Sequence, residues 1–202
     1  MSHRAIMLGS IAEGRTTVSG FLEGEDALAT LSAFREMGVE ITDPQSGRLT
    51  IHGAGLRGLK PPTQVMDVGN SGTSIRLMAG LLAGQSFDTI LTGDESLLRR
   101  PMARVITPFS QMGALISSHE GCPPLEIQGG RALGGIHYDM PVASAQVKSS
   151  VLLAGLFAQG RTSVTEPAPT RDHTERMLTG FGYAVDRDQG VISLEGGGSL
   201  HG

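Results

Sequence analysis

The chain has 202 residues, a net charge of −4 at pH 7, no Trp and aromatic residues at only 4% of its positions. An acidic chain without a run of Lys or Arg longer than two residues lacks the basic patch and the stacking platforms of nucleic-acid binders. No apolar stretch is long enough to span a bilayer, and the single cysteine, Cys122, cannot form an internal disulfide, which favours a cytoplasmic location. We therefore expect neither a nucleic acid nor a membrane as partner.

One supersecondary unit occurs three times in chain order, over about residues 1–62, 63–132 and 133–202. Each copy has an apolar helical run (4–14, 75–84, 151–160), a β-like run, a second helical run (27–38, 102–113, 173–182) and strands that end at a Gly-rich turn. Additional strands are expected between the copies, at 65–68 and 135–140. Repeats of this size share a core, so the sequence predicts one α+β domain of three βαβαββ-type repeats with pseudo-threefold symmetry.

The apolar pattern indicates where these helices lie. The first helical run of the second and third copies is apolar on nearly every side, which is typical of a buried helix. The second helical run is amphipathic. We expect parallel helices buried at the centre and sheets outside. Parallel helices place their N-termini at one end, where free N–H groups and helix dipoles attract anions, so six helix starts predict an anion-binding platform.

The polar segments before the helices differ between copies. In segment 67–76, Asn70 or Ser71 can cap a helix, Gly72 allows close approach of a ligand and Thr73 adds a hydroxyl. A plain capped helix explains the same residues, and the Gly-Lys-Ser/Thr of a P-loop is absent. At the equivalent place in the third copy, Ser144 can cap, and Gln146 and Lys148 are expected to reach back across the helix start.

Arginines stand where helix dipoles disfavour cations. Arg100 precedes Pro101, which we expect at the first position of a helix, and Arg171 precedes the helical run that begins at His173. Local rules tend to fail at functional sites, so these arginines could bind phosphate or carboxylate; solvated surface cations are the alternative. Asp172 and Glu175 have the spacing of a capping box. His173 belongs to no metal-ligand pattern or nucleophile motif, so no metal site is expected.

Six stretches resemble the 5-enolpyruvylshikimate-3-phosphate synthase family, in family order and over nearly the whole chain. They are SHRAIMLGS, FLEGED, DVGNSGTSIRLMAGLLAG, GDESLLRRPM, PVASAQVKSSVLLAGL and TRDHTERMLTGFG. The resemblance implies a two-domain transferase of the shikimate pathway of aromatic amino acid biosynthesis, with its site in the cleft between the domains. The implied reaction moves the enolpyruvyl group of phosphoenolpyruvate to the 5-hydroxyl of shikimate 3-phosphate and releases phosphate, without metal or cofactor.

The resemblance also assigns residues. Those matched to shikimate 3-phosphate are Arg4, Ser144, Ala145, Gln146, Thr170 and Arg171. Those matched to phosphoenolpyruvate are Asn70, Gly72, Thr73, Arg100 and Gln146. The family Lys-Ser pair before Ser2 and the second domain with the acid–base carboxylates have no counterpart here. We therefore expect a half that binds shikimate 3-phosphate, holds no catalytic residue and is inactive without the complementary C-terminal domain.

Alternatives stay open at this point. The UDP-N-acetylglucosamine enolpyruvyl transferases share the implied fold, but their loop cysteine lies near segment 93–101, whereas Cys122 comes later. A non-catalytic phosphometabolite-binding or docking module would fit the same polar segments. Gly72, where glyphosate-tolerant relatives often carry Ala, implies a glyphosate-sensitive parent enzyme.

Overall fold

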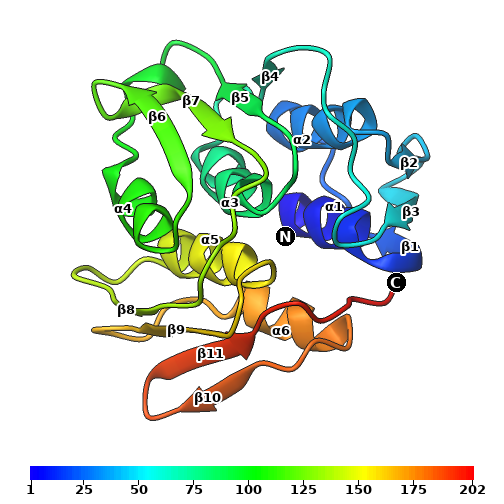
Figure 1. Cartoon of the computed structure of the whole chain (residues 1–202). Helices are drawn as coiled ribbons and strands as arrows, with labels where there is room; N and C mark the ends of the chain where they lie inside the picture. The colour runs from blue at the N-terminus through cyan, green and yellow to red at the C-terminus, as the bar shows by residue number, and fades with distance from the viewer.

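Three small sheets surround a central group of helices in the computed structural model, which describes residues 1–202 (Figure 1). The strand order of the first sheet is β1 (Glu13–Ser19), β3 (Arg48–Ala54), β2 (Glu40–Ile41). The order of the second sheet is β4 (Met66–Asp67), β5 (Thr89–Thr92), β7 (Cys122–Gln128), β6 (Leu115–His119). The order of the third sheet is β8 (His137–Asp139), β9 (Arg161–Thr165), β11 (Val191–Glu195), β10 (Asp186–Asp188). The pairs β4–β5 and β8–β9 are parallel, and all the other strand pairs are antiparallel. The second and third sheets therefore have the same order and directions.

The first sheet reaches the same pattern with residues from the far end of the chain. The amide N–H of Glu13 donates to the carbonyl of Leu200 at 2.7 Å, and the N–H of Gly202 donates to the carbonyl of Glu13 at 2.8 Å. The bridge between Glu13 and His201 is parallel. Residues 200–202 thus occupy, beside β1, the place that β4 and β8 hold in the other sheets.

Two helices belong to each repeat. The first helices are α1 (Ser2–Ile11), α3 (Gly72–Ala83) and α5 (Ala145–Gly155), and the second are α2 (Glu25–Glu36), α4 (Ala103–Gln111) and α6 (His173–Gly180). A short 3-10 helix, η1 (Leu97–Arg99), precedes α4. The 52 buried hydrophobic residues form one contiguous cluster, so the three repeats share a core. None of the helices combines the length and the apolar character needed to cross a membrane.

Helices α3 and α5 lie parallel and in close contact. A Cβ placed on Gly80 of α3 would lie 2.2 Å from the carbonyl oxygen of Ser150 of α5, so the two backbones touch. At one end of the pair, the Gln146 amide donates to the Thr73 hydroxyl at 3.0 Å. At the other end, the Arg57 guanidinium donates to the carbonyls of Gly84 and Phe157, where it faces the negative ends of both helix dipoles. Both N-termini therefore open at the same side of the molecule.

This arrangement confirms the predicted α+β fold with repeated units, central helices and outer sheets, and β4 and β8 lie at the two inter-copy positions. The N1 position expected for Pro101 is wrong, because α4 begins two residues later, at Ala103. The assignment of residues 1–202 to a single domain, with the stated repeat boundaries, stays a prediction.

Candidate functional site

A pocket of about 530 Å³ opens where four helices begin. It is lined by Arg4 from α1, Thr73 from α3, Ser144, Ala145 and Gln146 from the start of α5, and Pro169, Thr170, Arg171 and His173 from the start of α6. Every residue that the family resemblance matched to shikimate 3-phosphate lies in this lining. Of the residues matched to phosphoenolpyruvate, Thr73 and Gln146 line the pocket, while Asn70, Gly72 and Arg100 lie beside it.

Two serines cap the helices that form the centre of the pocket. The Ser71 hydroxyl accepts a hydrogen bond from the Ser74 amide at 3.0 Å, and the Ser144 hydroxyl accepts one from the Val147 amide at 3.3 Å. The cap of α3 is thus Ser71 and not Asn70. The remaining N–H groups at these helix starts favour an anion.

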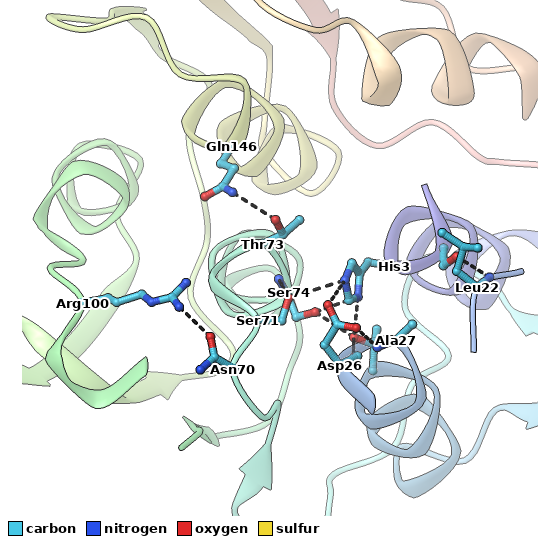
Figure 2. A network of polar contacts seen from close by, with 12 residues as sticks. His3, Leu22, Asp26, Ala27, Asn70, Ser71, Thr73, Ser74, Arg100 and Gln146 are labelled. Carbon is cyan, nitrogen blue, oxygen red and sulfur yellow. Dashed lines mark hydrogen bonds and ion pairs between the residues drawn. The ribbon is translucent and has the colours of Figure 1, made fainter. Parts of the chain in front are cut away.

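Asn70 holds the neighbouring arginine. Its side-chain oxygen accepts from Arg100 Nη2 at 2.5 Å (Figure 2). Its amide group donates to Asp94 Oδ2 at 2.7 Å. Backbone donation from Leu97 and the hydrogen bond from Asn70 lower the pKa of the Asp94 carboxyl, so Asp94 stays an ionised acceptor. Asn70 therefore orients the Arg100 guanidinium without neutralising it.

Gly72 lets two guanidinium groups approach each other. A Cβ at this position would lie 2.7 Å from Arg76 Nη1 and 2.8 Å from Arg100 Nη1. Arg76 Nη1 also donates to the Gly72 carbonyl at 3.0 Å and to Gln146 Oε1 at 3.1 Å. Burial, and then the charges of Arg100 and Arg104, lower the pKa of Arg76. Gln146, which bonds both Arg76 and Thr73, joins this cluster to the pocket.

Arg4 carries positive charge into the pocket from the other side. Its Nε donates to Thr174 Oγ1 at 2.8 Å and its Nη2 donates to Ser149 Oγ at 3.3 Å. Burial lowers the pKa of Arg4, the Glu175 carboxylate opposes this shift, and Arg171 adds to it. The guanidinium still remains charged, and two neutral hydroxyls hold it in place.

The arginines at the site have no carboxylate partner. None of Arg4, Arg76, Arg100 and Arg171 forms an ion pair within 4.0 Å, whereas Arg35, Arg99, Arg161 and Arg187 elsewhere in the chain each do. Like charges that lie this close are destabilising unless an anion lies between them. The site therefore has the charge of an anion-binding surface, although the whole chain is acidic.

His3, to which the sequence assigned no role of its own although the segment 2–4 stood out, joins three helix starts. Its Nδ1 lies 2.9 Å from Ser74 Oγ and 3.0 Å from Thr30 Oγ1, and its Nε2 lies 3.2 Å from Asp26 Oδ2 (Figure 2). Burial lowers the pKa of His3, and Asp26 opposes the shift. With the Arg76 contacts to the Pro101 carbonyl and to Gln146, and the Arg4 bond to Thr174, these bonds connect the starts of all six α-helices.

Two expectations about this region are wrong. Lys148 does not reach across the start of α5; it is buried, and its Nζ lies 2.7 Å from Glu175 Oε1. Asp172 makes no capping hydrogen bond through its side chain; its carboxylate lies 3.4 Å from Arg187 Nη1, and the Glu175 carboxylate contacts Lys148. Arg76, Ser149 and Thr174 were missed as site residues. Polar side chains within the first two turns of apolar or amphipathic helices were the available signal.

No three His, Cys, Asp or Glu side chains gather in a way that could hold a metal ion.

Residues 1–202, the whole chain, match the family described as EPSP synthase (3-phosphoshikimate 1-carboxyvinyltransferase). The chain belongs to the EPSP synthase family.

Similar proteins carry the same description. The chain is 63% identical over 203 residues to the 3-phosphoshikimate 1-carboxyvinyltransferase of Nitrosococcus oceani, and the match covers 100% of this chain and 46% of that protein. It is 66% identical over 201 residues to that of Methylococcus capsulatus, covering 99% and 46%. A solved EPSP synthase from Acinetobacter baumannii superposes with a TM-score of 0.97 at 60% identity, over 100% of this chain and 46% of that one. The chain therefore spans about half the length of the EPSP synthases that it matches. These relatives are described as EPSP synthases and not as UDP-N-acetylglucosamine enolpyruvyl transferases.

Proposed function

We propose that this chain is the shikimate 3-phosphate-binding half of an EPSP synthase. The complete enzyme would transfer the enolpyruvyl group of phosphoenolpyruvate to the 5-hydroxyl of shikimate 3-phosphate and release phosphate. A complementary domain of the same enzyme would be the partner of this half. The activity for which the relatives are named supports the reaction, and their greater length supports a second half. The cytoplasmic location expected from Cys122 stays a prediction.

One observation carries the proposal: unpaired arginines meet helix N-termini at a polar pocket. Arg4 and Arg171 lie at the pocket and have no carboxylate partner. A phosphate would accept charge-assisted hydrogen bonds from both guanidinium groups and from the amides of α5 and α6. The hydroxyls of Ser144 and Thr170 suit the ring hydroxyls of a small polyol such as shikimate.

The second cluster suits the second anionic substrate. Arg76 and Arg100 lie above Gly72, with Gln146 between this cluster and the pocket. We propose that Asn70, Gly72, Thr73, Arg100 and Gln146 contact phosphoenolpyruvate. Gln146 would then contact both substrates and set the distance between them. The isolated half would bind but would not turn over, because the site includes no carboxyl group placed for acid–base catalysis.

A calorimetric titration of shikimate 3-phosphate into the isolated chain tests the proposal. The test variant is Arg171→Ala and the matched control is Arg176→Ala, an exposed arginine on α6 with no ion pair. Charge-assisted hydrogen bonds contribute about 1.5–3 kcal/mol, so we expect roughly a tenfold to hundredfold loss of affinity in Arg171→Ala. The control should bind as the wild type does.

Equal affinity of Arg171→Ala and wild type would refute the assigned pocket. If wild type and both variants bind shikimate 3-phosphate saturably and then release phosphate steadily once phosphoenolpyruvate is added, the expected inactivity of the isolated chain is refuted. Absence of binding by the wild type would overturn the idea of a preformed site in this half. In that case, the titration repeated with the complementary half of a close relative shows whether the two halves form the site together.

A further inference from the structure

A buried ion-pair group lies beneath the loop that carries Thr170 and Arg171. Lys148 is 1% exposed, and its Nζ lies 3.0 Å from Glu166 Oε1 and 2.7 Å from Glu175 Oε1. Glu175 is also 1% exposed. The chain's other lysine, Lys60, is exposed. Burial of charges is unfavourable even when they are paired, so this group contributes little to stability relative to apolar residues, and its position in the fold has to be explained otherwise.

The two carboxylates stand at the two ends of the loop. Glu166 follows the last residue of β9, and Glu175 lies in the first turn of α6. Lys148, on the neighbouring α5, therefore ties both ends of segment 167–174 to a single point. Arg187 of β10 adds a further contact, with Nη2 3.3 Å from Glu175 Oε1.

Thr170 belongs to the same chain of contacts. Its hydroxyl donates to Glu166 Oε1, which is also the oxygen that Lys148 contacts. One step further along the chain, Arg171 lines the pocket and makes no ion pair of its own. The contacts thus run from the core of α5, through Glu166, to the residue beside the pocket arginine.

Little else holds this loop. The main-chain groups of residues 167–171 form no hydrogen bond with other main-chain groups. A second cavity of about 380 Å³ is lined in part by Lys148, Thr170 and Arg187. Because Pro169 and Thr170 line both this cavity and the substrate pocket, the loop borders two cavities and has few packing partners there, so side-chain contacts must fix its position.

We propose that Lys148 is a positioning residue that holds Thr170 and Arg171 at the rim of the substrate pocket. Its ammonium group never touches a ligand; it fixes Glu166 and Glu175, which fix the loop. The consequence for ligand affinity rests on the proposed function, whereas the effect on the loop does not.

The rate of trypsin cleavage measures how often the loop opens without any ligand, because trypsin cleaves after exposed arginines such as Arg171. The test variant is Lys148→Met, and Lys60→Met is the control for loss of a lysine. We expect cleavage after Arg171 to accelerate about tenfold in Lys148→Met, since cleavage follows the population of locally open chains. Cleavage within α3 after Arg76 reports global unfolding and should change much less, as identified by mass spectrometry of the first fragments.

Lys148→Met leaves Glu175 without its lysine and could prevent folding. The double variant Lys148→Met/Glu175→Gln removes the buried pair together and keeps Glu166 with Thr170. Circular dichroism shows which of the two variants folds. If the folded variant is cleaved after Arg171 at the wild-type rate, the proposal is overturned. Equal acceleration at Arg76 and Arg171 would also overturn it, because that result means a general loss of stability.

Titration of shikimate 3-phosphate into the same proteins separates the two proposals. A variant with a loosened loop should bind about tenfold more weakly than wild type, and Lys60→Met should bind normally. If wild type binds no shikimate 3-phosphate, the proposed function fails, while the cleavage rates still decide the role of Lys148. Undiminished affinity in a variant with a loosened loop would overturn the link between loop and pocket.

Discussion

The contact between α3 and α5 makes a strong prediction for Gly80→Ala. The added Cβ would lie 2.2 Å from the carbonyl oxygen of Ser150, and ordinary contact begins at 3.4 Å. The helices would have to separate by roughly 1.2 Å, which is 3.4 minus 2.2 Å. The neighbour is main chain within a helix, so it cannot rotate away as a side-chain end would.

The magnitude follows from two opposing effects. Overpacking a tight contact costs about 1–3 kcal/mol and sometimes more, while Ala in place of Gly favours a helix by about 1 kcal/mol. Because the obstacle is backbone, we expect a net loss of about 2 kcal/mol in the free energy of unfolding. For a chain of this size that lowers Tm by about 4–8 °C.

Urea denaturation measures this loss, with the slope of the transition checked for constancy. The control is Gly180→Ala at the end of α6, where a Cβ would meet nothing within 4 Å. We expect the control to be as stable as wild type or slightly more stable. Wild-type stability in Gly80→Ala would refute the inferred backbone contact, and with it the close pairing that brings Thr73 and Gln146 together.

Three further predictions concern stability. Burial lowers the pKa of His3 in the folded protein, so on acidification the unfolded chain takes up the proton first and wild type should lose stability as the pH falls through about 6.5 and below. In His3→Gln the Tm should therefore decline less steeply with falling pH, and equal Tm–pH curves for the two proteins would contradict this. Phe109→Ala, at a fully buried ring, should lower the free energy of unfolding by about 3–5 kcal/mol in urea denaturation, and a loss below about 1 kcal/mol would exclude a packed core there. Tyr183→Phe removes a hydroxyl that donates to the Glu195 carbonyl at 2.6 Å and accepts from the Gly198 amide at 3.2 Å; a loss of about 1–2 kcal/mol is expected, and thermal unfolding with an unchanged Tm would show that neither bond contributes.

Local features of this protein could be predicted from the sequence. The periodicity of the helices and the Gly-rich turns depend on neighbouring residues, so the repeats and the gathering of helix starts followed from the pattern. Ser71 and Ser144 cap helices within three residues of themselves, which is the range over which capping rules apply. The pattern pointed to Thr73, Ser144, Gln146 and Arg171 among the residues that line the pocket, and the family resemblance assigned Arg4, Ala145 and Thr170 as well.

Long-range partners explain what could not be predicted. Asp172 and Glu175 have the spacing of a capping box, but Lys148 lies 27 positions before Glu175 in the chain (175 − 148) and offers that carboxylate a buried cation. His3 finds Ser74 through the packing of α1 against α3. Spacing along one segment carries no information about either contact, because the Lys148–Glu175 pair forms only when two helices of the third repeat pack together, and the His3–Ser74 contact forms only when the first and second repeats meet.

The strand that residues 200–202 add beside β1 makes the first repeat depend on the last residues of the chain. Glu13 and His201 are 188 positions apart (201 − 13), which is among the longest loop closures that this chain can make, and closures of that length slow folding. During synthesis, the second repeat can complete its own sheet while the third is still being made, but the sheet of the first must wait with an open edge. Exposed edges of this kind invite pairing with other chains. Of the three repeats described here, the first is thus the last to complete its sheet, and until then its edge is open to misassembly.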